Sequence, residues 1–199
     1  MLTPFVATTD VPVVDLHSIL ADDVDAALDH DVDLAGSSLP PPEHRHILPI
    51  AEIPVMVQDT EEAYESFGVT VVGDLELLSQ SWLIVPRSGV EAAVVAATAT
   101  LEHAPSIREV STGSVAQSLA AHGQGLAFVT EAQRFGLGAV SARANGEPIT
   151  ITLYASWDVH HYATADPRQV AEALRAWMSA NPPGGPREVW PVLVALTDR

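Results

Sequence analysis

Residues Ile107 to Glu131 (IREVSTGSVAQSLAAHGQGLAFVTE) constrain the fold of this chain most, because a helix pattern lies between two strand patterns. After the end of the first strand, Val115 and Leu119 place apolar residues one helical turn apart. A Gly-Gln-Gly sequence ends the helix, and Leu126–Val129 is a second apolar strand. In such a unit the free N–H groups and the positive dipole end of the helix lie at the carboxyl edge of the strands, which suits anionic or polar ligands.

The start of this helix carries the first candidate ligand-binding residues, Ser111, Thr112, Gly113 and Ser114. Three hydroxyl groups and a small glycine are suited to a polar ligand at the strand edge. The alternative is that Ser111, Thr112 and Ser114 only cap the helix, which is a common use of Ser and Thr at such positions. Both interpretations are consistent with the sequence.

A second strand edge with polar residues follows the apolar run SWLIV at residues 81–85. Arg87 and Ser88 come directly after it, so they are candidate ligand-binding residues at the carboxyl end of a strand. They are equally well explained as a turn that opens the alanine-rich helix predicted over residues 90–101.

The rest of the chain alternates strand and helix patterns, which predicts an α/β fold. Further strands, all short apolar or β-branched runs, are expected at residues 11–16, 32–35, 47–57, 69–72 and 149–155. Further helices, recognised by apolar stripes or start signals, are expected at residues 19–29, 74–79 and 166–181. Residues 59–66 are expected to be a polar connector, and residues 132–148 a short helix followed by a loop.

The charge of the chain argues against one class of partner. The formal net charge is −17, and all 9 cationic side chains are arginines. A nucleic-acid-binding surface requires the opposite sign. Half of the 26 acidic residues precede Ala63, where Arg45 is the only cation, so an acidic solvated face is expected there.

Several kinds of chemistry lack their usual residues. The absence of cysteine excludes thiol catalysis, thiolate metal sites and disulfides. His44-x-His46, and His160-His161 near Asp158, do not match a metal-binding spacing, and no hydrolase or nucleotide-binding motif is present. We therefore expect no catalytic residue, no metal and no cofactor.

The N-terminal sequence MLTPFVATTD has neither the basic nor the long apolar part of a signal peptide. No apolar run approaches the ~18 residues of a membrane span. A soluble, cytoplasmic protein without membrane contact is expected.

A family resemblance becomes specific within the stretch described first. Val110 and Ser111, the apolar helix positions, Gly123-x-Gly125 and the Leu-Ala-Phe-Val strand resemble, without a gap, the second-lobe signature of LysR-type transcriptional regulators. This signature belongs to their effector-binding (substrate-binding) domain. Thr130 stands where the family usually has proline. The resemblance runs over residues 2–180 and includes the DVDLA strand and the polar loop of a first lobe.

The resemblance implies an α/β protein of two Rossmann-like lobes with an inter-lobe cleft, like type 2 periplasmic binding proteins. Lobe one (regulatory subdomain I-like) is expected to comprise residues 1–57 and 155–199, and lobe two (regulatory subdomain II-like) residues 58–154. The ligand in the cleft is expected to be a small-molecule effector, with a carboxylate as the candidate group, and the domain to be a homodimer. The implied ligand-binding residues are Ser37, Ser38, Arg87, Ser88, Ser111, Thr112, Gly113, Ser114 and Thr130.

Four functions follow from this resemblance and from the composition. The main prediction is the effector-binding domain of a LysR-type transcriptional regulator, without its helix-turn-helix. The alternatives are a stand-alone cytosolic small-molecule-binding protein and an interaction module that pairs with a complete regulator. An enzyme ranks last, because no catalytic motif is present.

The resemblance also implies a gap in the first lobe, because the family's first strand has no counterpart before Leu2. An interior slot in a sheet must be filled, or backbone groups and apolar faces stay exposed. Val189–Leu196 (VWPVLVAL) is an apolar run typical of a buried parallel strand. We therefore expect residues 188–196 to supply the strand that relatives take from their N-terminus. The alternative is that the run packs on the outside of lobe one or at a dimer edge.

The charge of −17 leads to a testable prediction. The purified chain is expected to show no binding to duplex DNA at moderate salt, because it offers no basic surface to replace the counterions of the phosphates. The measurement is a gel-shift titration at several salt concentrations, in which a salt-dependent shift would contradict the prediction.

Overall fold

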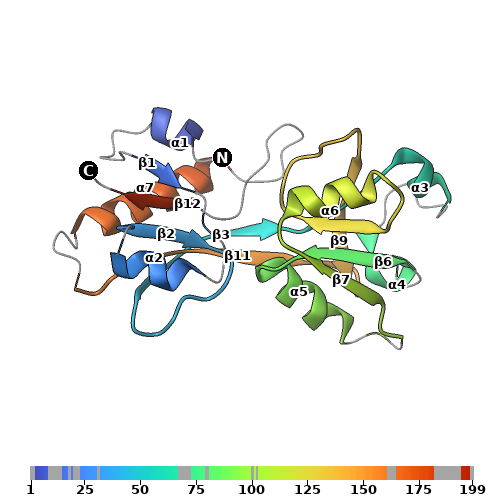
Figure 1. Cartoon of the computed structure of the whole chain (residues 1–199), viewed down its shortest axis with the longest axis horizontal. Helices are drawn as coiled ribbons and strands as arrows, with labels where there is room; N and C mark the ends of the chain where they lie inside the picture. Colours follow the sequence, from blue (N-terminus) through green and yellow to red (C-terminus); the bar gives the residue numbers. More distant parts are fainter. Residues whose placement is uncertain are drawn as a thin grey trace. The chain divides into compact units, whose positions relative to one another are not determined.

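The chain divides into two compact units, which are described separately. The computed structural model describes residues 3–8, 15–17, 19, 23–30, 32–66, 73–78, 81–99, 101, 103–160, 165–181 and 194–197. Unit 1 comprises Met1–Glu52 with Thr152–Arg199, and unit 2 comprises Ile53–Ile151 (Figure 1). The lobe boundaries predicted from the sequence fall after residues 57 and 154, a few residues later than the observed divisions after residues 52 and 151. One apolar strand runs across each observed division, so the sequence pattern does not mark these points. The predicted inter-lobe cleft stays a prediction.

Unit 1 is built on a five-stranded sheet. Its strands, in spatial order, are β1 (Asp15–His17), β12 (Val194–Thr197), β2 (Leu34–Ser37), β11 (Thr150–Trp157) and β3 (His46–Pro54). The strand predicted over 11–16 and the helix predicted over 19–29 are described only in part, as β1 and as the helix α2 (Val24–His30). The run at residues 47–57 is divided between β3 and a strand of unit 2.

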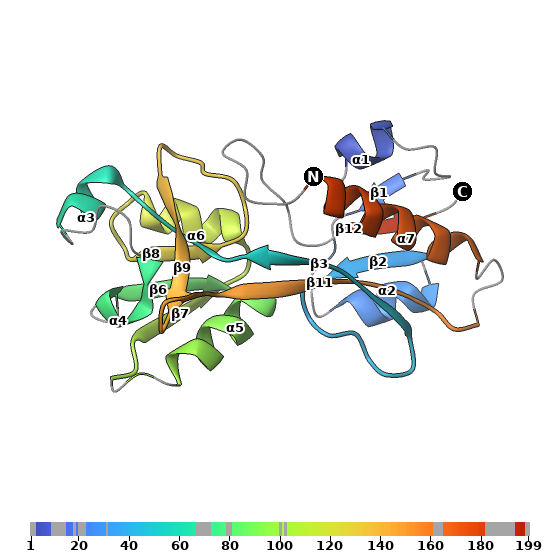
Figure 2. The same cartoon turned by 180° about the vertical axis from the view of Figure 1, so that it is seen from behind.

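Helices α2 and α7 (Ala165–Ala180) lie on opposite faces of this sheet (Figure 2). The predicted apolar stripes are confirmed in most of their described positions, because Val24 and Leu28 of α2 are buried, as are Val170, Leu174 and Met178 of α7. Trp177, also predicted for α7, is only partly buried, and Leu20, predicted for α2, lies outside the described residues. The short helix α1 (Thr3–Thr8) packs on α7 through an edge-to-face contact of aromatic rings.

The tail contributes an interior strand, β12, which lies between β1 and β2. The expectation that the tail fills a slot in the first-lobe sheet is confirmed for residues 194–197, whereas residues 188–193 lie outside the described residues. The expected parallel direction is wrong, since β12 is antiparallel to both neighbours. An apolar run indicates burial on both faces but carries no information on strand direction. The correspondence with the relatives' N-terminal strand stays a prediction.

Unit 2 is built on a seven-stranded sheet. Six strands, in order, are β10 (Glu147–Pro148), β9 (Gly138–Ala144), β4 (Met56–Asp59), β8 (Leu126–Val129), β6 (Trp82–Pro86) and β7 (Ser106–Val110), and β5 (Gly73–Asp74) pairs with β9. Its helices are α3 (Glu61–Ser66), α4 (Leu75–Leu78), α5 (Gly89–Thr98) and α6 (Gly113–Ala120). The helices predicted over 74–79 and 90–101 are α4 and α5.

The predicted strand–helix–strand unit is confirmed as β7, α6 and β8. Strand β6 is parallel to β7 on one side and to β8 on the other. The crossovers through α5 and α6 therefore run in opposite directions, which places the two helices on opposite faces of the sheet (Figures 1 and 2).

The buried face of α6 differs from the prediction. Val115 is exposed and Leu119 is only partly buried, whereas Ala116 and Ala120 pack against the core residues of β6 and β8. The buried stripe thus lies one residue further along the helix. Alanine lets the helix approach the sheet closely, so the larger side chains lie at the margin of the contact.

Two predictions of secondary structure are wrong. Residues 61–66 of the expected connector form α3, where the hydroxyl of Thr60 accepts a hydrogen bond from the N–H of Ala63. Residues 132–148 contain the hairpin of β9 and β10 in place of a helix. Asn145 and Gly146 have φ values of 52° and 80°, which suit a tight hairpin turn, and Asn-Gly is a strong signal for such turns. The strand expected at 69–72 lies outside the described residues.

No helix among the described residues is long and apolar enough to cross a membrane.

The two glycines before β8 lead to a prediction about stability. Gly125 has φ +136°, and a Cβ there would lie 2.5 Å from the carbonyl oxygen of Trp82, whereas Gly123 has φ +68° and open space around it. We expect Gly125→Ala to lower the free energy of unfolding by ~2–4 kcal/mol, and Gly123→Ala by ~1 kcal/mol. Urea unfolding of both variants is the measurement, and equal losses would refute the steric argument.

Candidate functional site

The carboxyl ends of three parallel strands meet at one edge of unit 2. Pro86 at the end of β6 is in register with Val110 at the end of β7, and β8 runs in the same direction on the other side of β6. The N–H of Arg87 donates to the carbonyl of Val110 at 2.9 Å, which ties the two strand ends together. The predicted residues of unit 2 therefore lie on neighbouring segments of one edge, which we call the ligand edge. It comprises Arg87, Ser88, Ser111, Thr112, Gly113, Ser114, Thr130 and Glu131.

Two hydroxyl groups of the ligand edge serve as helix caps. The side chain of Thr112 accepts a hydrogen bond from the N–H of Val115 at 3.3 Å and caps α6. The side chain of Ser88 is buried and accepts one from the N–H of Val90 at 3.2 Å, capping α5. The alternative of capping is thus confirmed for Thr112, and a ligand-binding role for both residues stays a prediction.

The other predicted polar groups differ in how they are engaged. The hydroxyl of Ser114 accepts a hydrogen bond from Arg134 at 3.2 Å. The guanidinium of Arg87 is exposed and lies 3.3 Å from the carboxylate of Glu109. Ser111 is exposed at the end of β7. The side chain of Thr130 is only 6% exposed, and its hydroxyl has no hydrogen-bond partner in the described part of the chain.

Glu131 is not among the ligand-binding residues predicted from the sequence, and its carboxylate lies against the first residue of α6. A Cβ on Gly113 would lie only 2.1 Å from Oε1 of Glu131. The N–H of Thr130 donates to Oε2 at 3.1 Å. Burial raises the pKa of this carboxyl. The charge of Arg134 and the backbone N–H groups of Glu131 itself, Thr130 and Gly113 lower the pKa, but they do not offset the effect of burial. Only the position directly after β8 could have indicated this residue in the sequence.

Two buried glutamines hold the segment that carries Glu131. Nε2 of Gln117, on α6, donates to Oε1 of Gln58, on β4, at 2.8 Å. Nε2 of Gln58 donates to the carbonyl of Glu131 at 2.7 Å, and Nε2 of Gln117 also donates to the carbonyl of Ala132. Both side chains are fully buried, so the segment after β8 is fixed between a strand and a helix.

Ser37 and Ser38 belong to unit 1, at the end of β2, and both are buried. The hydroxyl of Ser37 accepts a hydrogen bond from the N–H of Leu39 at 3.0 Å, which shapes the turn after the strand. Their role in ligand binding stays a prediction.

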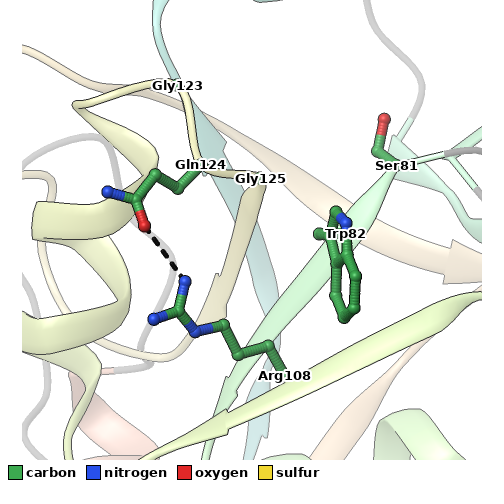
Figure 3. A pocket seen from close by; sticks show the side chains of 6 residues that line it. All are labelled: Ser81, Trp82, Arg108, Gly123, Gln124 and Gly125. Carbon is green, nitrogen blue, oxygen red and sulfur yellow. Dashed lines mark hydrogen bonds between the residues drawn. The ribbon is translucent and has the colours of Figure 1, made fainter.

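A pocket of about 770 Å³ lies at the opposite, amino edge of the parallel strands of unit 2. It is lined by Ser81, Trp82, Arg108, Gly123, Gln124 and Gly125. Figure 3 shows that the side chains of Trp82 and Arg108 project from neighbouring strands, and that Arg108 reaches Gln124 over 3.0 Å. An exposed indole face beside a guanidinium suits a flat ring with a negative group. None of the predicted ligand-binding residues lines this pocket.

Three acidic residues of unit 1 surround a buried arginine. Arg45 has a side chain that is 2% exposed and lies 2.8 Å from Asp25, 2.5 Å from Asp29 and 2.7 Å from Asp158. His44 lies 3.4 Å from Asp25. Asp25 and Asp158 thus serve in an ion network, and no metal-binding group of three or more His, Cys, Asp or Glu occurs among the described residues.

Comparison with known proteins shows the class of fold. No protein-family model matches the sequence, and no curated protein sequence does. Solved structures match it well, and the chain has the two-lobed α/β fold of the effector-binding domains of LysR-family regulators. The resemblance seen in the sequence is confirmed at the level of fold.

Three structures illustrate this similarity. The effector-binding domain of QuiR in complex with shikimate has a TM-score of 0.67 and 15% identity, over 81% of this chain and 79% of that one. The effector-binding domain of a BenM variant has a TM-score of 0.64 and 17% identity, over 86% and 83%. The regulatory domain of CcmR from Synechocystis PCC6803, in complex with 2-PG, has a TM-score of 0.61 and 17% identity, over 79% of each chain.

The raised pKa of Glu131 leads to a prediction about pH. The folded-state pKa of Glu131 lies above the ordinary value of 4.5, so ionisation of this carboxyl destabilises the folded state. The stability that the protonated carboxyl contributes is fully present below pH 4.5. It is lost as the pH rises through the raised pKa. Glu131→Gln does not ionise, so the difference in unfolding free energy between variant and wild type should grow in the variant's favour across that window. Urea unfolding from pH 4 to pH 8 is the measurement, and a difference independent of pH would rule the effect out.

Proposed function

We propose that this chain is the small-molecule effector-binding domain of a LysR-type transcriptional regulator. The observation that carries the proposal is the fold similarity over four fifths of the chain to domains such as those of QuiR and CcmR. Those two structures hold small molecules, shikimate and 2-PG. The neighbours are regulatory domains and not enzymes, which supports a role in binding without conversion of the ligand.

The ligand edge of unit 2 is the proposed binding surface in this unit. It places backbone N–H groups, hydroxyls and a guanidinium at the carboxyl ends of parallel strands, where α/β proteins commonly bind their ligands. The hydroxyl of Ser111 belongs to an exposed residue, whereas Thr112 and Ser88 cap helices and Ser114 accepts from Arg134. Ser37 and Ser38 are proposed to contribute from unit 1. We further propose that the domain acts as a cytoplasmic homodimer.

A thermal-shift screen of polar metabolites, followed by calorimetry, tests this function. A ligand at 100 times its Kd should add ~2.7 kcal/mol to the unfolding free energy. Ser111→Ala should then weaken binding about fivefold, or ~1 kcal/mol, because a ligand group loses its partner while both helix caps stay intact.

Ser106→Ala is the matched control, since Ser106 opens the same strand at the opposite edge. It should leave the affinity unchanged. Equal weakening by both substitutions, or none by Ser111→Ala, would place the ligand elsewhere. A screen in which no metabolite stabilises the protein would contradict the proposed function.

A further inference from the structure

The start of α6 already holds a carboxylate from the chain itself. A Cβ on Gly113 would lie 2.1 Å from Oε1, 2.2 Å from Cδ and 2.3 Å from Oε2 of Glu131. The carboxylate therefore lies where a side chain of residue 113 would begin, and only glycine at this position leaves room for it. A ligand carboxylate bound at the start of this helix would lie close to the carboxylate of Glu131.

The backbone donors of this position are engaged as well. The N–H of Thr130 donates to the carboxylate of Glu131 at 3.1 Å, and the backbone N–H of Gly113 acts to lower the pKa of the same carboxyl. The N–H of Val115 is taken by the side chain of Thr112. Some of the groups that make a helix start attractive to an anion are thus already engaged within the protein.

Each arginine at the ligand edge lies near an acidic side chain of the protein itself. The cation that acts on Glu131 is Arg134, whose guanidinium also binds Ser114. Arg87 is matched by Glu109 at 3.3 Å. An added ligand carboxylate would therefore face Glu131 at close range without an unmatched arginine at this edge, and like charges at such distances repel.

A second observation concerns Thr130, whose backbone N–H binds the same carboxylate. The hydroxyl of Thr130, next to Glu131, is buried and has no partner among the described residues. A buried hydroxyl without a partner is costly, and a polar ligand group can satisfy it. The outer lone pairs of the Glu131 carboxylate also accept hydrogen bonds.

We propose that Glu131 is a resident anion that determines the specificity of the ligand edge: the ligand group bound at the start of α6 is a hydrogen-bond donor, an ammonium or a hydroxyl, and not a carboxylate. This replaces the carboxylate expected there from the sequence. The proposal rests on the proposed function for the existence of a ligand, whereas the occupation of the helix start by Glu131 can be tested without one.

Sulfate is the probe for the occupied position. Wild-type protein, Glu131→Ala and Glu91→Ala are titrated with sodium sulfate against sodium chloride of equal ionic strength, and the backbone amide NMR signals of Gly113, Ser114 and Thr130 are followed. Glu91 is a matched control, because it is an acidic residue in the first turn of the neighbouring helix α5. Glu131→Ala should gain saturable binding with shifts at these amides, and the other two proteins should not.

Paired compounds that differ only in bearing an ammonium or a carboxylate group test the ligand class. Glu131→Gln keeps the size of the side chain and removes its charge, so it also serves if Glu131→Ala does not fold. We expect this variant to bind the ammonium compound about tenfold more weakly than wild type, which corresponds to ~1.4 kcal/mol, and to favour the carboxylate compound.

Saturable sulfate binding by the wild type at Gly113, or its absence in a folded Glu131→Ala, would overturn the proposal. So would a wild-type preference for the carboxylate compound at these amides. If no compound of either class binds any of the proteins, the proposed function fails, and the sulfate titration still decides whether Glu131 occupies the helix start.

Discussion

The ligand edge depends on the pair of buried amide side chains, Gln58 and Gln117. They link β4, α6 and the segment after β8 in one continuous set of hydrogen bonds, and neither side chain is accessible to solvent. Losing either partner would leave buried polar groups unsatisfied, at a cost of ~1–3 kcal/mol each. The same bonds fix the backbone of Glu131, so the position of its carboxylate follows from interactions that lie entirely inside the unit.

Unit 1 contains a buried arginine that forms ion pairs with several carboxylates. Its acidic residues repel one another, and a single buried guanidinium gathers three of them. The hydrogen bond from Arg45 is the main reason why the pKa of Asp29 lies below its ordinary value, so this carboxylate is held in its charged form. Arginine suits this role because its planar fork has five donors, which a lysine could not replace. Three carboxylates of the unit are therefore held by one buried side chain.

The sequence predicted those parts of the fold that local patterns encode. The strand at Leu126–Val129 has the predicted bounds, and β7, α6 and β8 follow in the predicted order. The buried face of α6 was missed because packing against the sheet favours Ala116 over the larger Val115. The β9–β10 hairpin was missed although Asn145-Gly146 is a local signal for it. Glu131 and the direction of β12 could not be predicted, since contacts between distant segments determine both.

The interior position of β12 affects how the chain can fold during synthesis. Residues 53–151 leave the ribosome as a continuous segment, so unit 2 can form its sheet while translation continues. Unit 1 cannot, because β12 separates β1 from β2 and is made about 160 residues after β2. Until then, β1 and β2 lack the strand that pairs with both of them. The nascent first unit thus exposes open strand edges until β12 has been made, and these are the surfaces that chaperones would protect.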